Sequence, residues 1–197
     1  MKRYLANLLV LISLVSFSQN SKFRIEASYP LPLDQNFIGK YYDGIADLGV
    51  KYQIKELNNF TLGVSLNTAL LKADRNEYSI IFDDPISYKV TAYSFEPRFF
   101  MELKLKKIAK LHTAFGVGYS FMFFNAKNTS PEENIPNSSS TESGINTNLQ
   151  IAYDISKRIY VQAQYDFILL TNLEDGIPKN KYNTNINLIK FGIGFRL

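Results

Sequence analysis

Hydrophobic and polar residues alternate with a period of two over long stretches of this 197-residue sequence. The clearest stretch is 60–70, where one face carries Phe60, Leu62, Val64, Leu66 and Leu70. Residues 111–123 and 145–155 repeat the pattern, with large apolar side chains at alternate positions. Successive side chains of a β-strand point to opposite faces, so this period predicts half-buried strands rather than helices.

Eight stretches of this kind follow one another along the chain. We place the strands at 22–29, 44–54, 60–70, 87–101, 110–124, 144–154, 159–170 and 184–197. A tilted strand needs about 9–11 residues to cross a bilayer, and most of these stretches reach that length. The pattern is therefore typical of a membrane-spanning sheet as well as of a soluble one.

The gaps between the predicted strands are alternately long and short. The long gaps are rich in Pro, Asp, Asn, Ser and Lys, and they lie at 30–43, 71–86, 125–143 and 171–183. An up-and-down barrel with both chain ends on one side has tight turns at that side and long loops at the other. The sequence therefore predicts an all-β fold, an eight-stranded antiparallel up-and-down transmembrane β-barrel.

The polar face decides between a soluble barrel and a membrane barrel. Aromatic residues lie near strand ends on the apolar face, as an interfacial girdle requires. The opposite face carries four basic and four acidic residues inside the predicted strands: Arg24, Glu26, Asp47, Lys51, Glu96, Arg98, Asp166 and Lys190. On a soluble barrel these residues would form a solvated face. Inside a narrow barrel they need ion-pair partners, and their equal numbers predict a structural, salt-bridged network that closes the lumen.

The N-terminus has the three parts of a secretory signal peptide. Lys2 and Arg3 precede an apolar run at 5–15, and small residues at Ser16 and Ser18 mark a cleavage site. The alternative, a membrane-anchoring helix, needs about 20 apolar residues and this run is shorter. We therefore expect a cleaved signal at 1–18 and one barrel domain at 19–197.

Composition and charge exclude several functions. The chain has no cysteine, and its formal net charge of +4 includes Lys2 and Arg3 of the predicted signal. The remaining charge is too small to indicate nucleic-acid binding. The acidic pairs at 83–84 and 132–133 lack the ligand spacing of a calcium loop, so no metal or other cofactor is expected.

His112 is the only histidine and therefore the main candidate for catalysis. Hydrolysis needs a nucleophile, a base and an orienting acid within reach of one another. Ser120 lies eight positions further along the same predicted strand, and no motif brings it to His112. We interpret His112 as a structural residue of the lumen and expect no enzyme activity.

Over the whole mature chain, the sequence resembles the outer membrane protein β-barrel domain family. The resemblance is carried by the signal peptide, the eight alternating strands, the long loops and the last strand, Ile189-Lys190-Phe191-Gly192-Ile193-Gly194-Phe195-Arg196-Leu197. That family includes small barrels of OmpA and OmpX type, also called porin family proteins. The resemblance implies a location in the outer membrane of a Gram-negative-type bacterium and no enzyme activity. It also implies that the barrel-assembly machinery reads the alternating residues Ile189, Phe191, Ile193, Phe195 and Leu197, although such signals end in an aromatic residue and this chain ends in leucine.

Three functions from different classes follow from these observations. The first is a structural or interaction barrel at the cell surface, whose ligand would contact the long loops at 30–43, 71–86, 125–143 and 171–183. The second is a narrow channel or transport conduit for small solutes, which the balanced luminal charges disfavour. The third is a lipid-modifying enzyme, which the absence of a catalytic set disfavours. We expect the first, with outer-membrane lipid as the surrounding partner.

Overall fold

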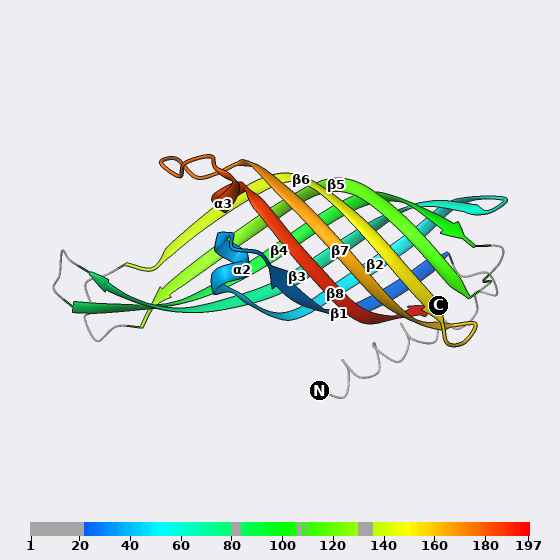
Figure 1. Ribbon diagram of the computed structural model, residues 1–197, viewed down its shortest axis with the longest axis horizontal. Helices are drawn as coiled ribbons and strands as arrows, with labels where there is room; N and C mark the ends of the chain where they lie inside the picture. Colours follow the sequence, from blue (N-terminus) through cyan, green and yellow to red (C-terminus); the bar gives the residue numbers. More distant parts are fainter. Residues whose placement is uncertain (1–21, 80–83, 106–107, 109, 130–135) are drawn as a thin grey trace, which may run out of the picture.

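The computed structural model describes residues 22–79, 84–105, 108, 110–129 and 136–197. Eight strands form one closed antiparallel barrel in the order β1 to β8 (Figure 1). The strands are β1 Phe23–Leu33, β2 Asp43–Leu57, β3 Phe60–Ser79, β4 Asp84–Lys104, β5 Leu111–Asn128, β6 Ser138–Asp154, β7 Ile159–Asn172 and β8 Asn185–Arg196. Two short helices, α2 Phe37–Tyr41 and α3 Lys181–Thr184, lie in the connections β1–β2 and β7–β8. The predicted signal at 1–18 lies outside the described residues.

Closure depends on the pairing of the first strand with the last. The register runs from Arg24 opposite Arg196 to Leu33 opposite Asn187, so β1 and β8 pair along most of their length. All other neighbouring strands are consecutive in sequence and, like β1 and β8, pair antiparallel. The predicted eight-stranded up-and-down barrel is therefore confirmed.

One end of the barrel holds the start of β1, the end of β8 and the tight turns, and we call it the terminal end. The β2–β3 turn places Asn58 at φ 48°, a left-handed conformation that asparagine tolerates better than most residues. In the β6–β7 turn the Ser156 hydroxyl accepts hydrogen bonds from the backbone N–H groups of Arg158 and Ile159. The opposite end, which holds α2, α3 and the long connections, is the loop end (Figure 1).

The strands at the loop end are longer than predicted, and this corrects three of the expected loops. Most of 71–86 belongs to β3 and β4, because β3 continues to Ser79 and β4 begins at Asp84. The 125–143 segment is likewise shared between β5 and β6, and 30–43 contains the end of β1 and all of α2. Only 171–183 remains largely a loop. Residues 80–83 and 130–135, within two of these segments, lie outside the described residues.

The reason for the difference is an inversion of polarity along the strands. Near the terminal end apolar side chains point outward, whereas past Leu70 the outward residues of β3 are Lys72 and Asp74, both exposed. The inward residues at this height, Leu71 and Ala73, are buried. A strand leaving the bilayer meets water on its outer face, so the favourable side for apolar residues changes. The outward polar residues of these segments therefore give the strands the sequence pattern of loops.

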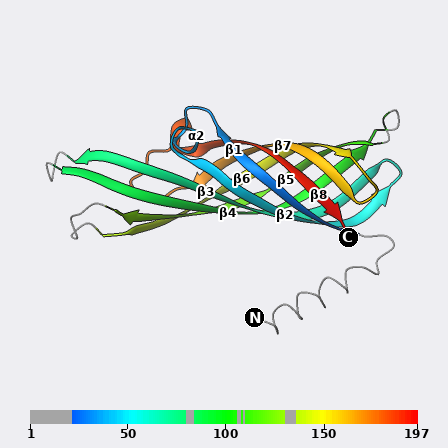
Figure 2. The same ribbon diagram turned by 90° about the horizontal axis from the view of Figure 1, so that it is seen from below.

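The inward apolar side chains at the loop end pack together into an apolar plug. Helix α2 closes this plug through Ile38, which is fully buried, and it lies at the loop end beside β1 (Figure 2). Asn36 caps the start of the helix, and its side chain accepts a hydrogen bond from the Gly39 N–H at 2.7 Å. A Cβ on Gly39 would lie 2.0 Å from the Leu33 carbonyl oxygen, so only glycine allows this close approach. The plug consists of Ile38, Tyr42, Leu71, Ala73, Val90, Ala92, Met122, Phe124, Ile168, Leu170, Ile186 and Leu188.

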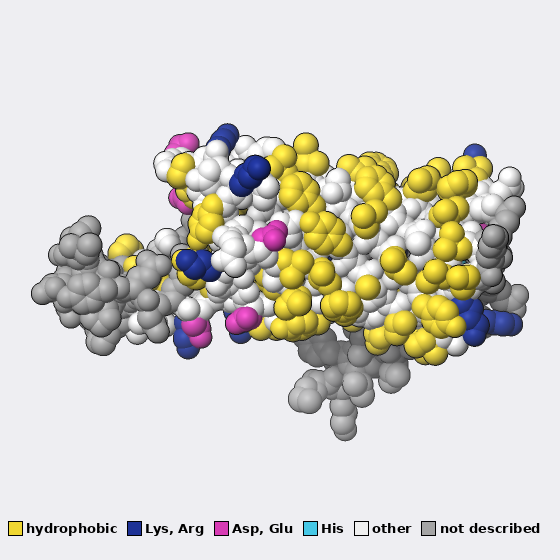
Figure 3. All heavy atoms as spheres, in the orientation of Figure 1, with side chains coloured by type: hydrophobic (Ala, Val, Ile, Leu, Met, Phe, Trp, Pro, Cys, Tyr) yellow, Lys and Arg dark blue, Asp and Glu magenta, His cyan; other side chains and the backbone are white. Residues whose placement is uncertain are grey.

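The outer surface carries a broad apolar band. On the face shown in Figure 3, hydrophobic side chains cover the middle of the barrel and charged ones gather toward its two ends. The most exposed apolar side chains include Phe99 at 70 % and Leu48, Leu149 and Ile193 at 58 %. A soluble protein rarely exposes so large a continuous apolar area, so this band indicates contact with lipid. Within the described residues, no helix is both long and apolar enough to span a bilayer.

The apolar band can be tested at Leu149, which lies on β6 between the exposed residues Ile145 and Tyr153. We expect Leu149→Arg to destabilise the barrel by about 2–4 kcal/mol, because a charge would enter the hydrocarbon. Urea unfolding in lipid vesicles measures this loss. Ser139→Arg is the matched control, because Ser139 is exposed on the loop-end part of the same strand. If both substitutions lowered the free energy of unfolding by the same amount, Leu149 would not be in contact with lipid.

Candidate functional site

The eight predicted luminal charges all lie on the inner wall of the barrel, and each side chain is buried. Arg24 is the most exposed of them at 7 %, and Glu96 and Asp166 are fully buried. Strand alternation accounts for this placement, because each inward charge is flanked by outward residues. The interior is therefore ionic from the terminal end to the middle of the barrel, and apolar at the plug near the loop end.

The central group of charges joins four strands around Lys190. The Lys190 ammonium nitrogen lies 2.7 Å from Asp47 Oδ2 and 2.7 Å from Asp166 Oδ2. Arg98 donates to Asp166 at 2.9 Å and also pairs with Glu96. The Lys190 nitrogen lies 3.4 Å from Glu96 as well. Two cations thus hold three carboxylates in the middle of the barrel.

A second group lies nearer the terminal end and is built on Glu26. The Lys51 ammonium nitrogen lies 3.0 Å from Glu26 Oε1, and the Tyr160 hydroxyl donates to the same oxygen at 2.6 Å. The Gln150 amide donates to Glu26 at 3.2 Å and its carbonyl accepts from Lys51. The carboxylate therefore receives neutral hydrogen bonds as well as an ion pair, which offsets the cost of its burial.

Arg24 forms a separate pair with Glu102, a residue that the sequence analysis did not include. The guanidinium donates to both carboxylate oxygens, one of them at 3.1 Å. Such two-point contacts match the fork of arginine to the carboxylate plane. Glu102 was missed because the predicted strand ended at residue 101, whereas β4 continues to Lys104. Its inward position follows the same alternation as Glu96 and Arg98.

Uncharged polar side chains complete the network around Arg98 and Glu96. Arg98 Nε donates to the Asn146 side-chain oxygen at 2.6 Å, and the Asn146 amide donates to the Ser120 hydroxyl at 2.8 Å. The Ser94 hydroxyl donates to Glu96 at 2.7 Å. Ser120 is thus bonded within the network rather than to His112.

His112 lies near the terminal end in contact with two carboxylates. Its Nε2 is 2.7 Å from Asp154 Oδ2, and its Nδ1 is 3.7 Å from Glu102 Oε1. Arg196 donates to the other Asp154 oxygen at 2.6 Å. This arrangement gives the histidine an acid on each side but no nucleophile among its described contacts.

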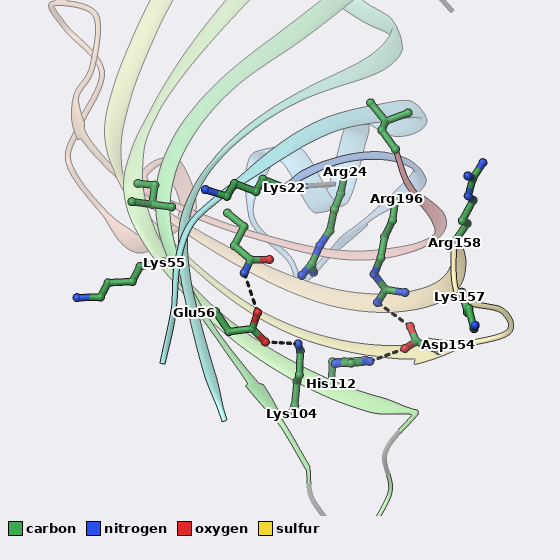
Figure 4. Close-up of a pocket in the computed structure, with 13 residues that line it drawn as sticks. Lys22, Arg24, Lys55, Glu56, Lys104, His112, Asp154, Lys157, Arg158 and Arg196 are labelled. Carbon is green, nitrogen blue, oxygen red and sulfur yellow. Dashed lines mark hydrogen bonds and ion pairs between the residues drawn. The ribbon is translucent and has the colours of Figure 1, made fainter. Parts of the chain in front are cut away.

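These residues border an open vestibule of about 780 Å³ at the terminal end (Figure 4). Arg24, Arg196 and His112 lie on its inner wall, and Lys104 forms a 2.6 Å ion pair with Glu56. Seven of the thirteen lining residues are Lys or Arg, whereas the acidic ones are Glu56 and Asp154. The vestibule is therefore strongly basic. Through Arg24 it borders the charge network of the lumen.

Metal ligation receives no support from the described part of the chain, where no group of three or more His, Asp or Glu residues could hold an ion. The Asp83 and Glu132–Glu133 candidates lie outside the described residues, and the side chain of Asp84 is not described either.

Four of the predicted assembly residues share the outer face of β8, and the fifth, Leu197, directly follows the strand. Phe191, Ile193 and Phe195 are exposed, while Ile189 and Leu197 are partly buried. The Leu197 N–H donates to the Phe23 carbonyl oxygen at 3.1 Å, beside the start of β1. Recognition of these residues by assembly machinery stays a prediction.

The network predicts a large cost for removing its central cation. Lys190→Met would leave Asp47 and Asp166 without their lysine, and we expect a loss of about 3–5 kcal/mol in the free energy of unfolding. Lys104→Met removes an exposed ion pair and should cost at most about 1 kcal/mol. Urea unfolding of both variants in the same vesicles makes the comparison. If both variants lost only a similar, small amount of unfolding free energy, the ion pairs of Lys190 would not stabilise the barrel.

Searches with protein-family models and against the curated proteins find no match for this chain. Solved structures do match. Ail of Yersinia pestis, solved with the heparin analogue sucrose octasulfate, has a TM-score of 0.56 and 14 % identity, covering 90 % of this chain and 97 % of that one.

Two further structures match in the same way. Neisserial surface protein A has a TM-score of 0.59 and 12 % identity, covering 90 % of this chain and 98 % of that one. OprG of Pseudomonas aeruginosa has a TM-score of 0.58 and 11 % identity, covering 90 % and 96 %. Identities this low establish a shared fold and no shared activity. The chain therefore shares the fold of small eight-stranded outer-membrane β-barrels.

Proposed function

We propose that the protein is a closed barrel in the outer membrane of a Gram-negative-type bacterium, and that it acts as an interaction protein at the cell surface. In this arrangement the terminal end faces the periplasm and the loop end faces the outside. Residues 1–18 are removed as a signal peptide, and β8 is read by the assembly machinery during insertion. No enzymatic role is proposed.

The closed lumen is supported by successive barriers along the barrel axis. Above the vestibule lie the Arg24–Glu102 pair, the group around Glu26 and the group around Lys190. The apolar plug follows, and its residues Ile38, Ile168 and Ile186 are fully buried. An ion crossing this path would have to separate buried ion pairs and then enter an apolar region, both at high cost.

The surface role rests on one observation, the solvated sheet that β3 to β6 form beyond the apolar band. Its inner face packs on the plug, so its outer face and edges are available to a partner. The outer face carries exposed lysines on three neighbouring strands: Lys72 on β3, Lys89 on β4 and Lys127 on β5. Lys89 lies opposite Lys127 on one side and opposite the exposed Asp74 on the other, so the three lysines outnumber the acidic residue among them. Sulfated polysaccharide is the ligand class that these cations fit, and the Ail structure contains a sulfated ligand.

The closed lumen predicts that the purified barrel forms no stable conductance steps in planar bilayers. A porin reconstituted in the same lipids serves as the positive control. Reproducible steps of defined size from the folded protein would instead establish the alternative function, a narrow conduit for small solutes.

The lysine face predicts binding of heparin that weakens with salt. We expect cells displaying the protein to bind fluorescent heparin, and neutralising the three lysines to reduce binding about ten-fold or more, because each lost phosphate-like contact lowers the salt-dependent affinity. The variant is Lys72→Gln, Lys89→Gln and Lys127→Gln.

The matched control removes the same charge from the terminal end, through Lys55→Gln, Lys110→Gln and Lys157→Gln, all at exposed positions. Binding should remain at the wild-type level in this control. Equal loss in both variants would show a general charge effect. No heparin binding by folded wild-type protein would reject sulfated polysaccharide as the ligand.

A further inference from the structure

A pocket of about 310 Å³ opens at the loop end, apart from the vestibule and the luminal network. Helix α2, the β7–β8 connection with α3, and the outer part of β6 surround it. Its lining combines aromatic rings with one carboxylate, and it consists of Phe37, Tyr41, Glu142, Ile177, Tyr182 and Asn183.

Glu142 differs from the carboxylates of the lumen in lacking an ion pair with any described residue. Its side chain lines the pocket although the residue is only 6 % exposed, and its Oε2 is buried without a hydrogen-bond partner. Glu26, Asp47 and Asp166, by contrast, each contact a lysine or an arginine. A buried carboxylate without a partner is costly, so its presence in a pocket indicates a missing cation.

Glu142 lies at the loop-end edge of the apolar band. The last exposed apolar residue of β6 is Ile145, and the other walls of the pocket come from α2 and the β7–β8 connection, which lie outside the band. Burial and, to a smaller extent, the nearby carboxylate of Glu174 together raise the pKa of Glu142 to about 7. The carboxyl therefore changes charge near neutral pH.

The groups that face Glu142 come from three elements. Glu174 lies on the β7–β8 connection, Tyr182 on α3 and Tyr41 on α2. Lys40, also on α2, is exposed, and its ammonium nitrogen lies 5.0 Å from the centre of the Tyr41 ring. An ammonium group of the chain itself therefore lies over one face of a ring that lines this pocket.

The aromatic wall is held in place by the plug. The Phe37 ring centre lies 5.9 Å from that of Phe124 and 6.4 Å from that of Tyr42, and both partners belong to the plug. The position of α2 is further constrained by its Asn36 cap. Phe37 and the helix that also carries Tyr41 are therefore held in position beside the pocket, which reduces the entropic cost of binding a ligand.

We propose that this pocket binds a small organic cation with an alkylammonium group, whose charge pairs with Glu142 and whose methyl groups contact Phe37, Tyr41 and Tyr182. Aromatic rings beside a carboxylate are the chemistry that recognises quaternary ammonium. The proposal does not depend on the polysaccharide ligand, because none of Lys72, Lys89 and Lys127 lines the pocket.

The test uses the folded full-length barrel in octyl glucoside, a non-ionic detergent, and isothermal titration with choline chloride. The matched control ligand is 3,3-dimethylbutanol, which has the same shape as choline without its charge. We expect choline to bind, the neutral analogue to bind at least about ten-fold more weakly, and Glu142→Gln to abolish the difference. Because ionised Glu142 is required and its pKa lies near 7, choline affinity should rise between pH 5.5 and pH 8.5.

Control variants separate this site from a general effect. Tyr182→Leu should weaken choline binding, whereas Glu56→Gln at the terminal end should not change it, and heat-modifiable migration on a gel verifies that each variant is folded. Titration with dihexanoyl phosphocholine distinguishes a lipid headgroup from free choline as the ligand. Both compounds carry the trimethylammonium group, and only the headgroup also carries a phosphate.

Several outcomes would overturn the proposal. Equal binding of choline and dimethylbutanol would identify an apolar pocket. Binding of calcium without choline would identify Glu142 and Glu174 as metal ligands. Absence of choline binding by folded protein at pH 8.5, or unchanged binding by Glu142→Gln, would reject the site.

Discussion

Pairing of β1 with β8 is the interaction on which the rest of the structure depends. A strand edge left open in lipid would expose backbone N–H and C=O groups that nothing in hydrocarbon can satisfy, so a sheet that spans a bilayer has to close. With eight strands the closed ring is narrow, and its interior is filled by side chains. The luminal charges are therefore brought within ion-pairing distance by closure itself, as Lys190 on β8 meets Asp47 on β2.

The second constraint is that the outer face of the longer strands passes from lipid into water. Inside the band the outer wall meets lipid and the inner wall is ionic, whereas beyond it the outer wall meets water and the inner wall is apolar. The same strand β3 carries Leu66 outward in the first region and Leu71 inward in the second. This change allows the sheet to continue past the membrane and provides the plug on which α2 rests.

The two ends of the barrel consequently differ in chemistry. The terminal end is a basic vestibule in which Asp154 contacts both Arg196 and His112. The loop end combines a lysine-bearing sheet with a separate aromatic pocket around Glu142. The charge network and the plug lie between them, so the two ends are suited to different partners rather than to a shared passage.

The sequence by itself determined the strand number, the antiparallel order and the inward position of eight charges, because alternation is a local property that each strand carries alone. Only the tertiary structure decided which charges meet, since this depends on the stagger between strands: Arg24 pairs with Glu102, 78 positions away. The extensions at 71–86 and 125–143 also escaped prediction, because their polarity is inverted outside the bilayer. The pocket around Glu142 joins three separate segments, and no local pattern could bring them together.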